Sequence, residues 1–123
     1  MEIRKTEEDS RGCEYSGDFN GKNFVILSFK KGASRGGHYH NLDCIHFILY
    51  GVLEIRTIDS KGKEKIEIAK AGDVIKVKSG VIHLFIAKKE SLILELRENN
   101  LETVKYRSYR KIVENFINKQ NKE

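Results

Sequence analysis

The sequence predicts an all-β protein, a small antiparallel β-barrel or jelly roll of about six to eight strands with a C-terminal helix. Short runs of β-branched and aromatic residues recur about every 8–12 residues, and glycines separate many of them. Proline is absent, so no proline-rich linker divides the chain. A length of 123 residues suits one hydrophobic core. Residues 1–123 are therefore expected to form a single domain.

The apolar runs give the expected strands in order. They are Phe24–Phe29, Ile45–Tyr50, Val52–Ile58, Lys65–Ala69, Val74–Val77, Val81–Ala87 and Leu92–Leu96. The segment 59–63 joins two of these runs and has the composition of a hairpin turn, in which Gly62 can take the positive φ that a tight turn requires.

The last twenty residues change period. Apolar residues recur at helical spacing, which predicts a helix over about residues 108–119 with one apolar stripe. The residues of that stripe are Tyr109, Ile112, Val113, Phe116 and Ile117. The stripe must cover something apolar. It favours a terminal helix that closes one end of the β core, and the alternative is a lid or a dimer element.

Composition and charge exclude several classes of protein. No apolar stretch approaches the ~18–20 residues of a membrane-spanning helix, and the first residues carry charges where a signal peptide is apolar. We therefore expect a cytoplasmic protein without a membrane partner. Lys+Arg 23 against Asp+Glu 18 gives a net charge of +5, but acids interrupt the bases, which argues against nucleic acid and leaves a small anionic ligand possible. Cys13 and Cys44 form no CxxC pair, so we expect reduced thiols.

The four histidines form the strongest functional pattern in the chain. His38, His40 and His46 fall within one short window, and His83 lies in the apolar run Val81–Ala87. In an extended strand, His38 and His40 project from the same face, about 7 Å apart. Two imidazoles on one rigid face can chelate one ion, and His83 could complete the site from another strand. The pattern predicts His38, His40 and His83 as ligands of one divalent transition metal.

The spacing of these histidines resembles the two motifs of the cupin superfamily. Residues 32–51 match the first motif, G(x)5HxH(x)3-4E(x)6G, except that Cys44 stands where the glutamate is usual. Residues 72–87 resemble the second motif, G(x)5PxG(x)2H(x)3N, and retain Gly72, Gly80 and His83. Lys78 and Ala87 replace the usual proline and asparagine. The resemblance implies a cupin barrel over most of the chain, while cupins include enzymes, binding proteins and storage proteins.

Cys44 is the departure that bears on the chemistry. In the family this position usually supplies a glutamate ligand, and a thiolate there would favour zinc, iron, nickel or copper over manganese. The alternative is that Cys44 is a small buried side chain that fills space.

His46 lies two residues after Cys44 and faces the same side of a regular strand. We predict that it is a catalytic acid or base, or a hydrogen-bond donor beside the ligands. It could also be a fourth ligand or a core histidine.

Three cations are candidate substrate-binding residues. Arg35, in the string Arg-Gly-Gly-His-Tyr-His, gives a weaker likeness to the cupins that isomerise or epimerise nucleotide sugars, where an arginine could pair with phosphate. Lys76 and Lys78 are two residues apart and could line the mouth of the barrel together with Arg35. For each cation the alternative is a solvated surface side chain.

Three functions remain open from the sequence. The first is a metal-dependent enzyme, an oxidoreductase of dioxygenase type or an isomerase, that acts on a small oxygen-bearing substrate. The second is a metal-free ketoisomerase or epimerase of nucleotide sugars. The third is a non-catalytic module that binds or senses a metal or small ligand. The sheet edges and the apolar outer face of such a barrel favour a homodimer.

Overall fold

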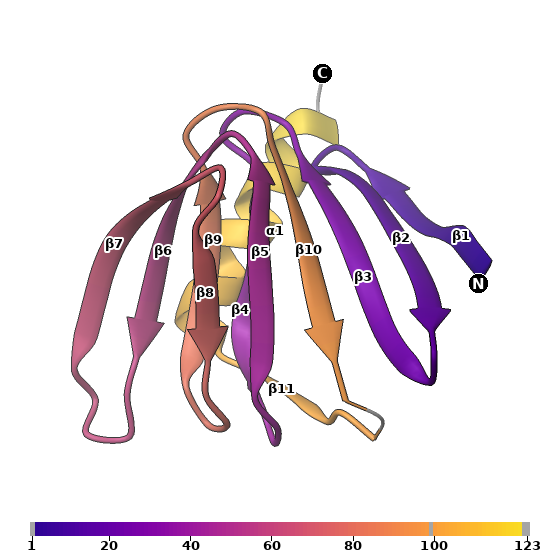
Figure 1. The fold of residues 1–123 in the computed structure, drawn as a ribbon. Coiled ribbons are helices and arrows are strands. Elements are labelled where there is room, and N and C mark those ends of the chain that lie inside the picture. Colours follow the sequence, from indigo (N-terminus) through magenta and orange to yellow (C-terminus); the bar gives the residue numbers. More distant parts are fainter. Residues whose placement is uncertain (1, 99, 122–123) are drawn as a thin grey trace.

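The computed structural model describes residues 2–98 and 100–121 of the chain. Within these residues it has eleven strands followed by one helix (Figure 1). The elements are β1 (Glu2–Asp9), β2 (Gly12–Phe19), β3 (Lys22–Phe29), β4 (Ser34–His40), β5 (Cys44–Tyr50), β6 (Val52–Ile58), β7 (Glu64–Lys70), β8 (Val74–Val77), β9 (Ile82–Ala87), β10 (Ser91–Arg97), β11 (Thr103–Lys105) and α1 (Arg107–Asn121).

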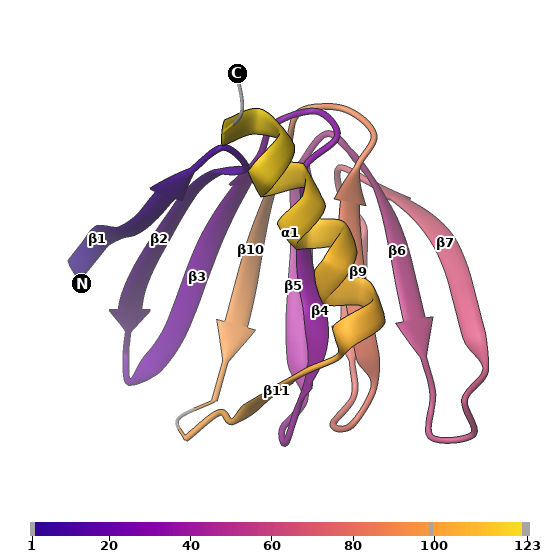
Figure 2. The same cartoon turned by 180° about the vertical axis from the view of Figure 1, so that it is seen from behind.

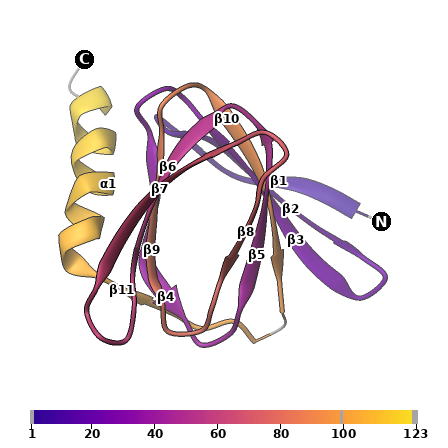
Figure 3. The ribbon, with the colours of Figure 1, turned by 60° about the vertical axis from the view of Figure 1, so that its left-hand side comes forward.

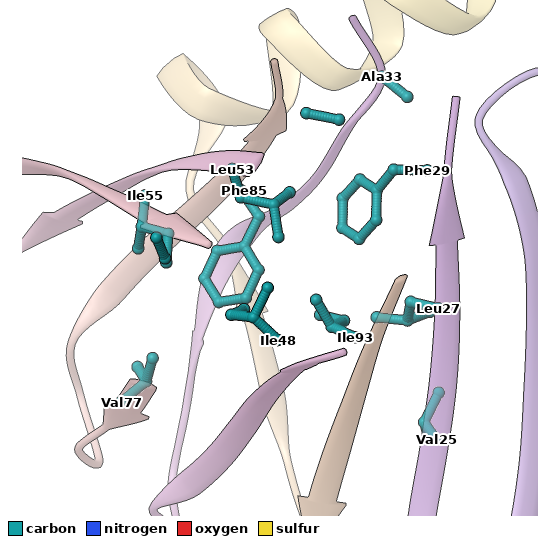
Figure 4. Packing of buried hydrophobic residues seen from close by; sticks show 12 residues of the cluster. Val25, Leu27, Phe29, Ala33, Ile48, Leu53, Ile55, Val77, Phe85 and Ile93 are labelled. Atoms are coloured by element: carbon teal, nitrogen blue, oxygen red, sulfur yellow. The ribbon is translucent and has the colours of Figure 1, made fainter. Parts of the chain in front are cut away.

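The strands form two antiparallel sheets that face each other. The six-stranded sheet has the order β1-β2-β3-β10-β5-β8, and the five-stranded sheet has the order β11-β4-β9-β6-β7. Figure 3 shows the two layers as the opposite walls of a barrel. Side chains from both inner faces meet in one apolar cluster, which includes Phe29, Ile48, Leu53, Phe85 and Ile93 (Figure 4). The fold is the jelly roll that the sequence predicts.

All seven apolar runs are strands, most of them extended by a residue or two beyond the predicted bounds. The predicted hairpin between β6 and β7 is also confirmed. The Asp59 carboxylate accepts hydrogen bonds from the backbone N–H groups of Lys61 and Lys63, and Gly62 has a φ of 80°. The turn residues therefore set the register of this hairpin.

The apolar runs of the sequence do not include β1, β2, β4 or β11, although an extended backbone was expected at His38 and His40 of β4. Exposed side chains explain the omission of two strands: β1 has almost no buried face, and every residue of β11 is exposed. Without a buried face, a strand shows no alternation of apolar and polar residues. The predicted range of six to eight strands was therefore too low.

Gly36 and Gly37, which precede the histidines, lie inside β4. Both have positive φ, and the register with β9 shifts between Gly36 and His38. The two glycines therefore form a bulge within the strand, where a residue with a side chain would be strained.

The C-terminal helix is confirmed, but it does not close an end of the barrel. Figures 2 and 3 show α1 lying along the outer side of the five-stranded sheet. Its buried residues Tyr109 and Val113 form a second apolar cluster with Leu84 of β9. The helix takes this place because β9 has apolar side chains on its outer face as well. Among the described residues, the single helix is too short and too polar to cross a membrane.

The turn between β5 and β6 leaves no room for a side chain at Gly51. This glycine has a φ of 92°, and an added Cβ would lie 2.7 Å from the Cα of Ser91 and against the carbonyl of Glu90. Gly62 has a similar φ of 80°, but an added Cβ there would meet nothing within 4 Å. An alanine would therefore strain the backbone at both positions, but only at Gly51 would its methyl group also clash with neighbouring atoms.

Gly51→Ala should therefore lower the free energy of unfolding by about 3 kcal/mol, since it combines backbone strain with overpacking. Gly62→Ala should cost only about 1 kcal/mol, because strain acts alone. Urea unfolding of both variants at equal m-values measures the difference. Equal losses would show that the contact with Ser91 relaxes freely.

Candidate metal centre

Strands β4 and β9 bring three histidines together inside the barrel. The antiparallel register places His38 directly opposite His83, and His40 follows on the same face of β4. The ring centroid of His38 lies 4.5 Å from that of His40 and 4.7 Å from that of His83. One nitrogen from each ring lies within 4.8 Å of the other two, so the group can hold a metal ion.

Hydrogen bonds orient two of these rings. The Nδ1 atom of His40 lies 2.9 Å from Oγ1 of Thr103, and Nδ1 of His83 lies 3.2 Å from the carbonyl oxygen of Val81. A carbonyl only accepts, so Nδ1–H of His83 is the donor and its Nε2 carries the free lone pair. The Thr103 hydroxyl can accept from Nδ1–H of His40, and in that tautomer Nε2 of His40 is likewise a lone-pair nitrogen. Such bonds fix the tautomer and direction of histidine ligands.

The Nε2 atom of His40 is buried and has no hydrogen-bond partner within residues 2–98 and 100–121. A buried nitrogen without a partner is costly unless a ligand satisfies it. Burial, followed by the charges of the neighbouring histidines, lowers the pKa of His38 to about 3. Burial also lowers the pKa of His83 to about 4. The rings are therefore neutral at pH 7, as metal ligation requires, and the three residues fit a divalent ion.

A buried histidine–carboxylate pair, bonded to a half-buried arginine, lies beside the three histidines. Glu95 of β10 stands opposite His46 of β5, and its Oε1 lies 2.6 Å from Nε2 of His46. The other carboxylate oxygen accepts a hydrogen bond from Nε of Arg97. Burial raises the pKa of Glu95, but the bonds and charges of His46 and Arg97 outweigh burial and lower it. Glu95 is therefore ionised although it is 4% exposed.

The sequence analysis predicted His46 and missed Glu95. The signal was present, since Glu95 is the only charged residue in the apolar run 92–96 and shares the parity of the buried Ile93. Its partner His46 lies 49 residues away in the chain, so only the pairing of β5 with β10 identifies the contact.

Comparison with known families places these residues in context. The sequence matches the family described as cupin over residues 20–120. The chain belongs to the cupin family. A search of curated proteins found no match.

Solved structures of oxalate decarboxylases share this cupin's fold. The enzyme from Bacillus subtilis at pH 4.6 superposes with a TM-score of 0.72 at 21% identity, over 84% of this chain and 30% of that chain. The Lactobacillus farciminis enzyme in its formate complex gives a TM-score of 0.69 at 21% identity, over 80% and 33%. This cupin thus spans about a third of their length. At such identity the likeness shows the fold alone.

Cys44, the departure from the cupin motif, is not part of the three-histidine group. Its side chain is fully buried on the inner face of β5. Burial raises the pKa of the Cys44 thiol to about 11, and the charge of Glu95 adds to the effect. Its burial and its place outside the three-histidine group favour the space-filling alternative. Its role as a ligand remains a prediction.

A small pocket of about 110 Å³ opens onto the metal centre. His38, His46 and His83 line it together with Glu95 and four arginines. The arginines are Arg11, Arg35, Arg97 and Arg110. Positive charge therefore surrounds the approach to the histidines, although Glu7 and Glu14 line the pocket as well.

The three predicted substrate-binding cations are placed differently. Arg35 lines the pocket, but Nε and Nη2 of its guanidinium already donate to the carbonyl oxygen of Ser28, at 3.1 and 2.8 Å. Lys76 stands opposite Ile45 on the outer face of its sheet, where its Nζ lies 3.8 Å from the Asp43 carboxylate. Lys78 is exposed, and neither lysine lines the pocket. The parity of β8 explains this, because Val77 takes the inward position between them. A role for these cations in ligand binding remains untested.

Removing one ligand should weaken metal binding far more than removing the thiol. We expect His83→Ala to lower the affinity for Co²⁺ at least about a hundredfold, because a three-histidine site loses one of its protein ligands. Cys44→Ser should change the affinity less than about threefold, and His46→Ala should fall between the two. Titration followed by the visible Co²⁺ spectrum measures all three. A Cys44→Ser variant as weak as His83→Ala would make the thiol a ligand.

The hydroxyl of Thr103 should contribute to metal affinity through His40. Thr103→Val removes the partner of Nδ1 and should weaken Co²⁺ binding about tenfold, the effect typical of losing a hydrogen bond to a histidine ligand. Thr103→Ser keeps the hydroxyl and should bind as the wild type does. Equal affinities for the valine and serine variants would exclude an orienting role for the Thr103 hydroxyl.

Proposed function

We propose that this cupin is a metal-dependent enzyme that acts on a small, oxygen-bearing and negatively charged substrate. One observation carries the proposal: two histidines of the three-histidine group, His38 and His83, line the same pocket as the hydrogen-bonded residues His46, Glu95 and Arg97. A site that only stored a metal would have no need of a buried ionised carboxylate paired with a histidine beside it. The arrangement favours chemistry in which a proton moves near a bound ion.

His38, His40 and His83 would hold one divalent metal. Bound there, the ion would supply a positive centre that polarises a substrate oxygen. The sequence favoured zinc, iron, nickel or copper because it counted Cys44 as a thiolate ligand, whereas the group that can hold a metal consists of the three histidines without Cys44. One of the matching solved structures was determined to assign the Mn(II) centres of Bacillus subtilis oxalate decarboxylase, at 20% identity. Manganese therefore belongs among the metals to be tested.

His46 would act as the acid or base that exchanges a proton with the substrate. Its Nε2 is bonded to Glu95, while its Nδ1 is buried and has no partner in the described part of the chain. Nδ1 is thus the nitrogen left to exchange a proton with a substrate. The Glu95 carboxylate would stabilise the imidazolium that forms, and Arg97 would hold the carboxylate in place. This division of roles suits an isomerase as well as a dioxygenase.

The size and charge of the pocket favour a small anion. A volume of about 110 Å³ is below the ~300–1,000 Å³ of pockets that enclose drug-sized ligands. A nucleotide-linked sugar would extend well outside it, and the Arg35 donors proposed to hold its diphosphate are engaged by Ser28. Arg110 is better placed to attract a carboxylate, because it lines the pocket and its buried Nε has no hydrogen-bond partner within residues 2–98 and 100–121.

The location and assembly of the protein remain predictions from its sequence. We propose a cytoplasmic homodimer, on the grounds of the reduced thiols and of the sheet edges and apolar outer face that a small barrel leaves.

The test is turnover by metal-loaded protein. Samples loaded in turn with Mn²⁺, Fe²⁺, Co²⁺, Ni²⁺, Cu²⁺ and Zn²⁺ would be incubated in air with small hydroxy-, keto- and dicarboxylic acids, and followed by proton NMR and oxygen uptake. We expect at least one acid to be consumed, with oxygen uptake separating a dioxygenase from an isomerase. Glu95→Gln should retain the metal and be at least about a hundredfold slower, because the buried base loses its partner.

Other outcomes would contradict the proposal. An acid that raises the melting temperature but is never consumed would identify a binding module. Consumption of a nucleotide sugar by metal-free protein would instead favour the ketoisomerase or epimerase alternative.

A further inference from the structure

Four cations gather around a second pocket, here called the outer pocket, where β11 leads into α1 (Figure 2). Its volume is about 450 Å³. The described residues that line it are all polar or charged: Lys105, Arg107, Arg110, Lys111, Glu114 and Asn115. Four cations and a single acid give this small surface a local charge of +3. Such a concentration of positive charge in a concavity attracts anions.

The spacing of the cations places them on one side of the helix. Counted from Arg107, the residues Arg110, Lys111 and Glu114 follow at i+3, i+4 and i+7, which are neighbours on a helix surface. The buried stripe of the helix, with Tyr109 and Val113, lies on the opposite side against β9. The charged side is therefore free to contact a ligand.

This arrangement is unfavourable for the helix itself. Acidic residues are preferred in the first turn of a helix, and α1 has none there. Arg107 instead faces two further cations at i+3 and i+4, where like charges repel. None of the four cations forms an ion pair with an acid within residues 2–98 and 100–121. A local conflict of this kind, without an evident gain in the folded chain, is typical of a functional position.

Arg110 is held in place at the inner end of the outer pocket. Its Nη1 donates to the carbonyl oxygen of Gly36 at 3.0 Å. An added Cβ at Gly37 would lie 3.0 Å from Cδ of Arg110, so this glycine makes room for the arginine side chain. The Nε atom is buried and has no hydrogen-bond partner in the described part of the chain. Arg110 therefore offers an oriented cation with unused hydrogen-bonding capacity, and it lines the pocket of the metal centre as well.

We propose that the outer pocket binds a small, multiply phosphorylated compound. Each phosphate group carries about −1.5 to −2 charges at pH 7, so two of them balance the local charge of +3. Arginine side chains pair bidentately with phosphate oxygens. The volume lies within the ~300–1,000 Å³ of small-molecule sites. The proposal does not depend on the proposed enzyme activity.

The lining favours a small soluble phosphate compound over other polyanions. Among the described residues around the outer pocket, none is apolar, so a lipid tail would find nothing to pack against. None is aromatic either, whereas sites for single-stranded nucleic acid normally provide rings on which bases stack. The chemistry on offer is confined to charge and hydrogen bonds.

The test is the binding of inorganic pyrophosphate to metal-free protein, measured by isothermal titration calorimetry at constant ionic strength. We expect saturable binding of one pyrophosphate per chain. Arg107→Ala/Lys111→Ala changes two exposed side chains that do not line the pocket of the metal centre. This variant should bind pyrophosphate at least about thirtyfold more weakly, because two charge-assisted contacts are lost. Its Co²⁺ affinity and far-UV circular dichroism should equal those of the wild type.

The matched control is Lys61→Ala/Lys63→Ala, which removes the same charge at two exposed positions between β6 and β7. We expect its affinity for pyrophosphate to stay within about threefold of the wild type, since only charges near the ligand act strongly at this ionic strength. Absence of saturable binding would overturn the proposal. A control that loses as much affinity as Arg107→Ala/Lys111→Ala, or an Arg107→Ala/Lys111→Ala variant that loses none, would overturn the assignment to the outer pocket.

Three further titrations test the class of ligand. Citrate presents three carboxylates and should bind at least about fivefold more weakly than pyrophosphate, because each carboxylate carries less charge than a phosphate group. Equal affinity for citrate would overturn the choice of phosphate. Tighter binding of a single-stranded oligonucleotide, or of vesicles that contain an anionic phospholipid, would overturn the choice of a small soluble compound.

Discussion

The antiparallel pairing of β4 with β9 is the constraint on which the metal centre depends. It sets His38 opposite His83, with a bulge at Gly36 that fixes which face the histidines share. Because side chains alternate along a strand, a slip of one residue would turn the histidines of β4 out of the barrel. The C-terminal segment holds this register from the other side. Strand β11 pairs with β4 opposite the histidines, and Nη1 of Arg110 donates to the Gly36 carbonyl at 3.0 Å.

The same barrel keeps an ionised carboxylate inside an apolar core. An isolated buried carboxylate would be strongly disfavoured, and it is tolerated here because His46 and Arg97 each bond one oxygen of Glu95. Its negative charge also acts on the three histidines, where it opposes the effect of burial on their pKa. Fold and chemistry are therefore coupled, since β10 supplies the carboxylate at the place where β4 and β9 supply the imidazoles.

The fold was predictable wherever a segment buries a face. The seven strands with apolar residues on at least one side, the hairpin at Gly62 and the terminal helix all follow from local periodicity and turn chemistry. Strands β1 and β11 were not predictable, because neighbouring strands pair with them through the backbone while their side chains remain exposed. The place of α1 was also undetermined, since its apolar stripe fits any apolar surface and only the outer face of β9 decides which one.

The sequence by itself determined the family resemblance and two of the candidate ligands, because the cupin spacing and the alternation of a strand place His38 and His40 on one face whatever surrounds them. Tertiary structure decided the rest. The partner of His46 is Glu95, brought from a distant strand, and the protonation of the Cys44 thiol follows from its burial. Both depend on distances and desolvation, which arise only when the sheets close on each other and which no local pattern of residues encodes.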